Sequence, residues 1–215
     1  MISLENISIQ QGSFSASRLN LTIEKGTHIC LMGETGCGKT TLMEIICGLR
    51  SIQHGKVLLN GIDHTQSSPA QRNIGYLPQD GVLFPAMTVS GQIALPLKAR
   101  HWEKEKIHNR VEEIAQLLKI SSLLDRLPSD LSGGERQRLA LARAISFKPE
   151  ILCLDEPFSA LDDQTKHELI AVLRDLKVQN KTTIFHISHH KEEVHLLSDK
   201  ILFMRNGALE NAPKN

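Results

Sequence analysis

The sequence predicts an α/β fold in which a mixed sheet is flanked by helices, preceded by an antiparallel β segment and interrupted by a helical insertion. Three observations support this prediction. Apolar, strand-like runs alternate with helical segments at both ends of the chain. A glycine-rich turn follows one of these strands near residue 33 and opens a helix. Between residues 88 and 147 the pattern is helical only.

The first part of the chain is predicted to be mainly β-structure. Its expected strands are short, apolar runs bounded by turn residues, and they are residues 2–9, 14–23, 27–32, 55–61 and 73–77. The first two are expected to form an antiparallel pair. Residues 40–47 predict a helix that stops at Gly48. An Asn-Gly turn at Asn60 closes the fourth strand, and Pro78 ends the fifth.

The middle of the chain is predicted to form a helical subdomain. Its apolar residues recur at the spacing of one buried helix face, as in Ile107, Val111, Ile114, Leu117 and Leu118. Strand and helix patterns alternate again afterwards, with strands expected at 151–154, 182–187 and 200–205. We therefore expect a single domain, with an α/β core of residues 1–85 and 149–215 and a helical subdomain of residues 86–148.

Composition limits the classes of function. The chain has 25 Lys and Arg against 24 Asp and Glu, a net charge of +1, so no basic field points to nucleic acid. The four cysteines show no C-x-x-C spacing, which favours a reducing compartment over a disulfide framework or a zinc site. Neither a secretion signal nor a membrane-spanning apolar run is evident, and we expect a cytoplasmic protein.

The most specific motif is a phosphate-binding loop of the pattern G-x-x-x-x-G-K-[ST] between a strand and a helix. Its residues are Gly33, Glu34, Thr35, Gly36, Cys37, Gly38, Lys39, Thr40 and Thr41. Glycine lets backbone N–H groups approach a phosphate chain, Lys39 adds positive charge, and the Thr40 hydroxyl can bind Mg²⁺. A chance match arises in about one chain in a hundred. We expect Cys37 to react faster than Cys30 or Cys153, unless its sulfur faces inward.

A second motif precedes an Ala- and Leu-rich helix. Ser132 and Glu135 have the S-x-x-E spacing of a capping box, which satisfies backbone donors at a helix start. Capping does not require Gly133 and Gly134, each of which costs about 1 kcal/mol relative to alanine inside a helix. We therefore expect something to approach this backbone closely.

These two motifs and the later pair Asp155-Glu156 together resemble the ABC-type ATPases, which are the ATP-binding subunits of ABC transporters. The segment from Leu131 to Gln137 is similar to the signature of that family. The resemblance covers nearly the whole chain and rests on several motifs in the right order. It implies a P-loop NTPase core with a RecA-like mixed sheet, an inserted helical signature subdomain, and hydrolysis of ATP with Mg²⁺.

The resemblance implies roles for four residues. Asp155 ends an apolar strand, where a carboxylate can hold Mg²⁺, and Glu156 is similar to the general base that activates the attacking water. Gln79 resembles the glutamine that contacts both the metal and this water, although alone it reads as an ordinary loop amide. His189 resembles the switch histidine that reaches the γ-phosphate. The simpler reading of the carboxylate pair is an acidic turn before Pro157.

A head-to-tail homodimer is also implied by the resemblance. In such a dimer ATP lies between the phosphate loop of one copy and the residues Ser132, Gly133 and Gly134 of the other. Asp162 resembles a residue of the loop that meets its twin across the dimer. On its own pattern, Asp162 is a helix cap.

Two positions that bear on nucleotide binding depart from the family pattern. His190 stands where aspartate is usual, which leaves the tethering of the switch loop open, and a metal cluster that includes His186 and His195 is an alternative reading. The family commonly stacks an aromatic ring on adenine at the position of Gln11. Phe14 is the nearest ring, and it either supplies this stacking face or fills the core of the first strand pair.

The segment from Leu83 to Val89 bears on the partner of the chain. Its Leu-Phe-Pro run is either packing within the helical subdomain or a docking surface, and we favour docking. It is similar to the segment by which importer ATPases grip the coupling helix of their membrane permease subunits, particularly those serving small oxyanions, polyamines and amino acids. Gly91-Gln92 stands where Glu-Asn is usual, so the identity of the partner stays open.

The resemblance thus predicts the ATP-hydrolysing subunit of an ABC importer of a small solute, peripheral to the cytoplasmic face of the inner or plasma membrane. The small regulatory β-domain that many such ATPases add is expected to be absent. The alternatives are a soluble ABC-type ATPase of a non-transport assembly and an export or lipoprotein-release system. Chromosome-type machines are disfavoured because the span between Thr41 and Leu131 holds no long heptad run.

Overall fold

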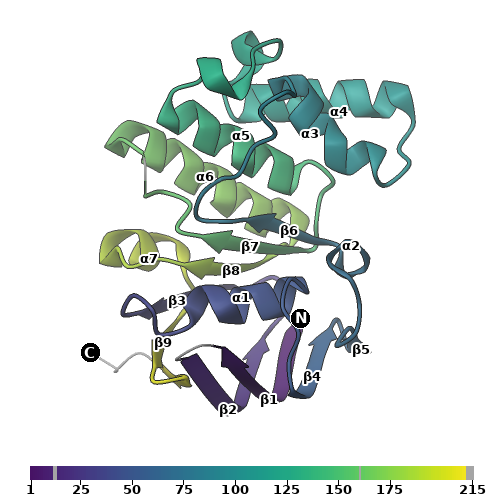
Figure 1. Cartoon of the computed structure of the whole chain (residues 1–215). Helices are drawn as coiled ribbons and strands as arrows, with labels where there is room; N and C mark the ends of the chain where they lie inside the picture. Colours follow the sequence, from purple (N-terminus) through teal and green to yellow (C-terminus); the bar gives the residue numbers. More distant parts are fainter. Residues whose placement is uncertain (12–13, 160, 212–215) are drawn as a thin grey trace.

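The computed structural model describes residues 1–11, 14–159 and 161–211 of the chain, and it contains two sheets and several layers of helices (Figure 1). The larger sheet has six strands in the order β10-β9-β3-β8-β7-β6. Its strands are β3 His28–Gly33, β6 Ile74–Leu77, β7 Ile151–Asp155, β8 Thr183–Ile187, β9 Lys200–Arg205 and β10 Ala208–Asn211. The predicted mixed sheet is confirmed, because all of these pairs are parallel except the β9-β10 hairpin.

The strands at the centre of this sheet are covered on both faces. Every residue of β7 and β8 is buried, as expected for parallel strands between helical layers. The two flanking helices on one face are α5 Gly133–Ile145 and α6 Asp163–Asn180 (Figure 1). Apolar residues of these helices form one core cluster with Leu152, Leu154 and Ile184 of the sheet.

The smaller sheet is antiparallel and lies below helix α1, Lys39–Cys47 (Figure 1). Its order is β2-β1-β4-β5, with β1 Ile2–Gln11, β2 Phe14–Ile23, β4 His54–Leu59 and β5 Ile62–Asp63. The predicted antiparallel pair is confirmed, and β1 runs two residues beyond its predicted end. Helix α1 is therefore packed between two sheets, and its residues share a core cluster with both.

The C-terminal end of α1 is held by a buried arginine. Gly48 ends the helix in the left-handed conformation, with φ of 78°. The guanidinium of Arg72, from the short helix α2 Pro69–Arg72, donates to the carbonyl oxygens of Ile45 at 2.6 Å and Ile46 at 2.9 Å. A positive charge at this end satisfies free carbonyls and complements the helix dipole. The helix that begins with the phosphate loop is thus fixed at its far end.

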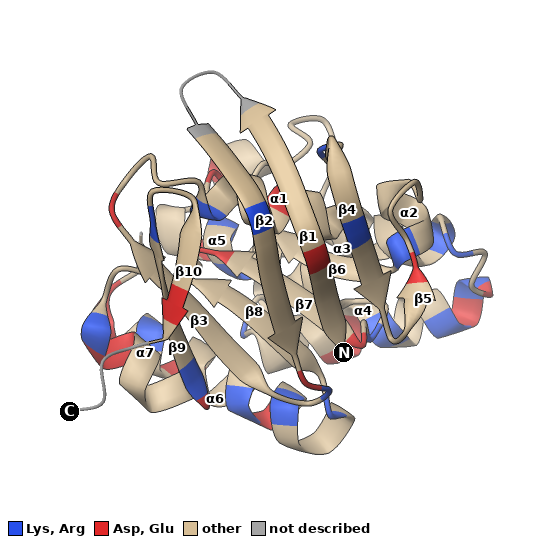
Figure 2. Cartoon of the chain, turned by 90° about the horizontal axis from the view of Figure 1, so that it is seen from below, with Lys and Arg blue, Asp and Glu red and all other residues tan. Residues whose placement is uncertain are grey.

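The helical insertion lies on the same side of the sheet as α6 (Figure 1). It consists of α3 Val89–Lys98, α4 Lys104–Leu117, α5 and two short 3₁₀ turns, Ser121–Leu123 and Pro128–Asp130. Helix α7, Lys191–Leu197, lies beside α6. Positive and negative residues are interspersed over helices and loops in Figure 2, which agrees with the net charge of +1. Among the described residues no helix is both long and apolar enough to cross a bilayer.

Two histidines are buried together in the larger sheet. The ring centroids of His28 in β3 and His186 in β8 are 5.5 Å apart, and both residues are fully buried. None of their ring nitrogens has a hydrogen-bond partner in the described part of the chain. Burial, with a smaller effect from Lys177, lowers the pKa of His28 to about 3. Burial likewise lowers the pKa of His186 well below its usual value.

These histidines predict a loss of stability in acid. The unfolded chain binds protons at these rings near pH 6.5 whereas the folded chain does not, so stability is complete above pH 6.5 and falls as the pH drops toward 3. Between pH 7 and pH 5 the loss is about 2 kcal/mol for each buried ring. Between pH 7 and pH 5, the free energy of unfolding of His28→Leu in urea should fall by about 2 kcal/mol less than that of the original chain.

The exposed His54 provides a control, because His54→Gln removes a histidine without changing the buried pair. If the free energy of unfolding fell equally with pH in His28→Leu and in the original chain, His28 would be protonated in the folded state.

Candidate functional site

The phosphate loop connects β3 to α1, as its sequence predicted. Gly38 caps the helix with φ of 101°, a backbone conformation that favours glycine. At Gly33 a Cβ atom would lie 2.5 Å from the carbonyl oxygen of Met204, so a side chain cannot be accommodated without a shift. These glycines leave the N–H groups at the start of α1 available to an anion.

Lys39 is folded over its own loop. Its Nζ donates to the carbonyl oxygens of Gly33 and Glu34, each at 2.8 Å. The same ammonium lies 4.0 Å from the Sγ of Cys37, and this partly buried sulfur packs against the core cluster around α1. The loop therefore holds one positive charge at its mouth, while the cysteine faces partly inward.

The phosphate loop is linked directly to the end of β7. Thr40 Oγ1 donates to Asp155 Oδ2 at 2.8 Å, although the two residues are 115 positions apart in the chain. Asp155 is only 1% exposed. Burial raises the pKa of Asp155, and the hydrogen bond from Thr40 opposes this effect. A buried carboxylate beside a hydroxyl is a hard oxygen donor set that suits Mg²⁺.

Glu156 has an unusual backbone. Its φ of 49° places a non-glycine residue in the left-handed region, a conformation that ten non-glycine residues of the described chain adopt and that costs about 1–3 kcal/mol. Its N–H donates to the carbonyl oxygen of Ile187 at 3.0 Å, which ties the turn to β8. Its carboxylate lies between two polar side chains: Gln79 Nε2 donates to Oε2 at 3.4 Å, and His189 Nδ1 is 3.1 Å from Oε1.

These residues line one cavity of about 320 Å³. Its lining residues are Thr35, Gly36, Gly38, Lys39, Thr40, Thr41, Gln79, Asp155, Glu156 and His189. The structure thus brings together most of the phosphate loop and all four residues to which the resemblance assigned a role in hydrolysis. Gly33, Glu34 and Cys37 belong to the loop without lining this cavity.

The signature residues lie elsewhere. Ser132 and Glu135 form the predicted capping box of α5, with Glu135 Oε2 accepting from Ser132 N at 2.7 Å. Gly133 borders a second cavity, of about 340 Å³, next to Gln79. A Cβ atom at Gly133 would meet no atom within 4 Å, and one at Gly134 would meet only Leu161 at 3.6 Å. The described chain itself gives no steric reason for the glycine pair.

Asp162 is another predicted residue that does not line the cavity. Asp162 is the N-cap of α6, and its Oδ1 accepts from Thr165 N at 3.0 Å. Hydrogen bonds from Thr165 lower the pKa of Asp162. The side chains of Phe14 and Gln11, which bear on adenine stacking, lie outside the described part of the structure.

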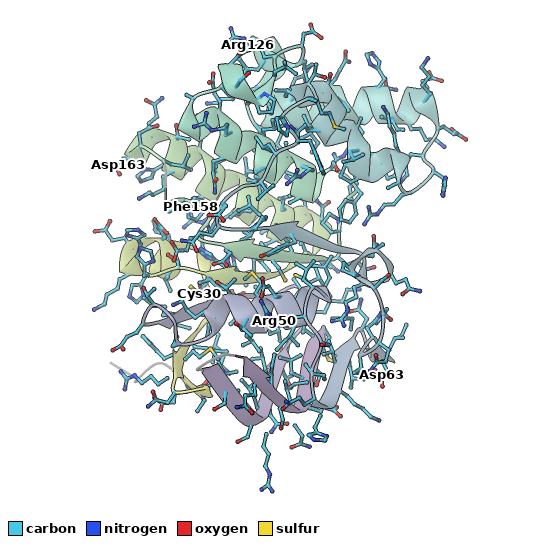
Figure 3. The ribbon with its side chains drawn as sticks, in the orientation of Figure 1. Cys30, Arg50, Asp63, Arg126, Phe158 and Asp163 are labelled. Atoms are coloured by element: carbon cyan, nitrogen blue, oxygen red, sulfur yellow. The ribbon has the colours of Figure 1, made fainter. Side chains whose placement is uncertain are left out.

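The histidines around the switch position do not converge. The rings of His189 and His190 have centroids 4.4 Å apart, whereas the buried His186 packs edge-on against Phe158. Figure 3 shows Phe158 and Asp163 on the segment that leads from the sheet into α6. Within the described residues no group of three or more histidine, cysteine or acidic side chains could hold a metal ion.

The segment from Leu83 to Val89 exposes its aromatic ring. Phe84 is 49% exposed, and the guanidinium carbon of Arg143 lies 5.7 Å from the ring centroid. The fully buried Gln92 holds the backbone of Phe84 at both ends, since its Oε1 accepts from Phe84 N at 3.2 Å and its Nε2 donates to Phe84 O at 3.0 Å. The sequence marked Gln92 only as a departure from the family pattern.

Comparisons with known proteins agree on one family. Residues 16–159 match the family described as ABC transporter. The molybdate/tungstate import ATP-binding protein of Pyrococcus abyssi is 40% identical over 209 residues, which are 97% of this chain and 61% of that protein. The molybdate/tungstate import ATP-binding protein of Archaeoglobus fulgidus is 44% identical over 193 residues, 89% of this chain and 80% of that protein.

A sulfate/thiosulfate import ATP-binding protein of Thermosynechococcus vestitus is 43% identical over 210 residues, which are 97% of this chain and 62% of that protein. The chain thus spans about three fifths of the length of several relatives. A dimeric ATP-binding cassette bound to ADP and Pi in a post-hydrolysis state matches the whole of both chains with a TM-score of 0.89 and 26% identity. A second dimeric cassette matches with a TM-score of 0.90 and 25% identity.

The position of Cys37 predicts selective alkylation. It is partly exposed, whereas Cys30, Cys47 and Cys153 are buried, and burial raises the pKa of Cys30 to about 12. Maleimide should therefore label Cys37 first, and bound MgATP should slow the labelling by covering the loop. Peptide mapping with and without MgATP measures both effects, with Cys37→Ser as the unlabelled control. Earlier labelling of another cysteine, or equal labelling with nucleotide, would contradict this assignment.

Proposed function

This chain belongs to the ABC transporter family, and from that membership we propose that it is the ATP-hydrolysing subunit of an importer for a small inorganic oxyanion. The observation that carries this proposal is the cavity in which the phosphate loop, Asp155, Glu156 and His189 meet. The relatives that resemble the chain at 40–44% identity are named for the import of molybdate/tungstate or sulfate/thiosulfate. The oxyanion is therefore proposed as the cargo class.

The phosphates of ATP are proposed to bind at the start of α1. The N–H groups there are free of intrahelical partners, and Lys39 is within reach of the same loop. Phosphate oxygens would take the place of the loop carbonyls as acceptors for Lys39. Thr40, Asp155 and Gln79 would hold Mg²⁺, which supplies charge neutralisation at the transferring phosphate when it is bound.

Glu156 is proposed to position and deprotonate the attacking water. Glu156 lines the cavity, and contacts with Gln79 and His189 restrict its carboxylate from both sides. A carboxylate fixed in this way can accept a proton without first reorganising. His189 is proposed to contact the γ-phosphate, because it lines the same cavity and more than half of its side chain is exposed.

A second copy of the chain is proposed to complete the nucleotide site. Gly133 and Gly134 have no steric requirement within the chain, so their small size suits a ligand or chain that approaches from outside. The two similar solved cassettes are dimeric. In the proposed head-to-tail homodimer, the start of α5 in one copy covers the phosphates bound to the other.

The membrane permease subunits are proposed to dock on the segment from Leu83 to Val89. Phe84 and Val82 are both exposed, at 49% and 61%, while Gln92 fixes the backbone of Phe84. An exposed ring on a rigid backbone is an anchor that costs little conformational entropy on binding. The chain is accordingly proposed to act at the cytoplasmic face of the membrane.

The first test replaces the proposed general base. Glu156→Gln should retain nucleotide binding, because the phosphate loop is unchanged, but should lose hydrolysis by at least about a hundredfold. ATP should then trap the dimer, which size-exclusion chromatography with MgATP measures. Glu105→Gln on the exposed face of α4 is the matched control and should behave as the original chain. Unchanged turnover in Glu156→Gln would remove Glu156 from this role.

A second test concerns docking. Phe84→Ala should change the stability of the lone chain by less than about 1 kcal/mol, because the ring is half exposed. The core control Phe158→Ala, at 2% exposure, should lose about 3–5 kcal/mol. Thermal unfolding compares them, and co-purification with the membrane subunits should fail for Phe84→Ala. A melting temperature as low as that of the core variant would identify Phe84 as a packing residue.

A further inference from the structure

We propose that Glu193 and Ser188 are positioning residues that hold the switch loop, residues 188–190. This inference rests on the proposed function of the cavity. Ser188 and Glu193 are 2% and 3% exposed, so their contact is shielded from water. Ser188 Oγ donates to Glu193 Oε2 at 2.9 Å. Ser188 Oγ also accepts from His190 N at 3.1 Å.

The hydroxyl of Ser188 therefore links the residue before His189 to the residue after it. It belongs to the residue before His189, and it receives the N–H of the residue after it. The side chain of His190 makes no capping hydrogen bond to α7. A hydrogen bond to a buried ionised carboxylate is stronger than one between neutral groups, which gives the loop a fixed anchor.

Packing alone does not fix the switch loop. A cavity of about 560 Å³ lies beside it between α6 and α7, lined by residues that include His189, His190, Lys166 and Glu193. This cavity is larger than the one over the phosphate loop, yet it contains none of the phosphate-loop residues. Because there is open space next to the loop, His189 is held by its own contact with Glu156 and by the hydrogen bonds of its neighbours.

Lys166 compensates the buried charge of Glu193. Its Nζ lies 3.2 Å from Glu193 Oε1, so the two groups form an ion pair. The angles at this contact are not those of a hydrogen bond. Lys166 stands in the first turn of α6, where its N–H donates to the carbonyl oxygen of Asp162 at 2.9 Å. The anchor of the switch loop is thus attached to the helix start that carries Asp162.

The experiment measures kcat and KM for MgATP hydrolysis by the purified chain and its variants. Ser188→Ala and Glu193→Ala should lower kcat about tenfold to a hundredfold and leave KM within about threefold, because only the position of His189 changes. Glu193→Gln keeps an oxygen that accepts from Ser188 and should restore most of kcat. Lys177→Met removes a different ion pair of α6, with Asp199, and should match the original chain.

Hydrogen exchange of the peptide that contains His189 and His190 provides a readout that needs no activity. The amide of His190 should exchange at least about tenfold faster in Ser188→Ala and Glu193→Ala, but not in Glu193→Gln. Absence of hydrolysis by the original chain would count against the proposed function alone, and exchange would still decide the inference. The inference would be overturned if Ser188→Ala and Glu193→Ala exchanged the His190 amide as slowly as the original chain. It would also be overturned if these variants raised KM and left kcat unchanged.

Discussion

The parallel pairing of β3, β8, β7 and β6 places the loops that follow these strands at one edge of the sheet. Strands of one direction end on the same side, so residues distant in the chain meet there. The Thr40–Asp155 hydrogen bond is the most direct consequence, because it joins the first turn of α1 to the end of β7. The nucleotide chemistry proposed for the chain depends on this arrangement.

Each group at this edge is restrained by a different part of the fold. Arg72 holds the far end of α1, and the N–H of Glu156 is bonded to the last residue of β8. The proposed anchor of His189 reaches α6 through Glu193 and Lys166. Preorganisation of this kind keeps the polar groups in position before substrate binds, which is how such sites lower a reaction barrier. Gln92 likewise holds the backbone of Phe84, the residue proposed for docking, in position.

Much of the fold could be predicted from the sequence, because apolar periodicity and glycine-marked turns are local signals. The capping box at Ser132 was equally local and is confirmed. The left-handed backbone of Glu156 could not be predicted, since no side-chain pattern marks it and the bond to Ile187 that maintains it is made by the fold. Glu193 reads as one charge in a polar helix start, and its burial depends on α6, which lies far away in the sequence.

In the proposed homodimer, one copy of the chain binds ATP and the other copy completes the site. Mixing two inactive variants tests it most directly: Lys39→Ala disables the phosphate loop, and Ser132→Arg blocks the start of α5. A mixed dimer retains one site with both parts intact, so the mixture should regain up to about a quarter of the original hydrolysis rate. No regained activity from variants that still form mixed dimers would contradict the claim.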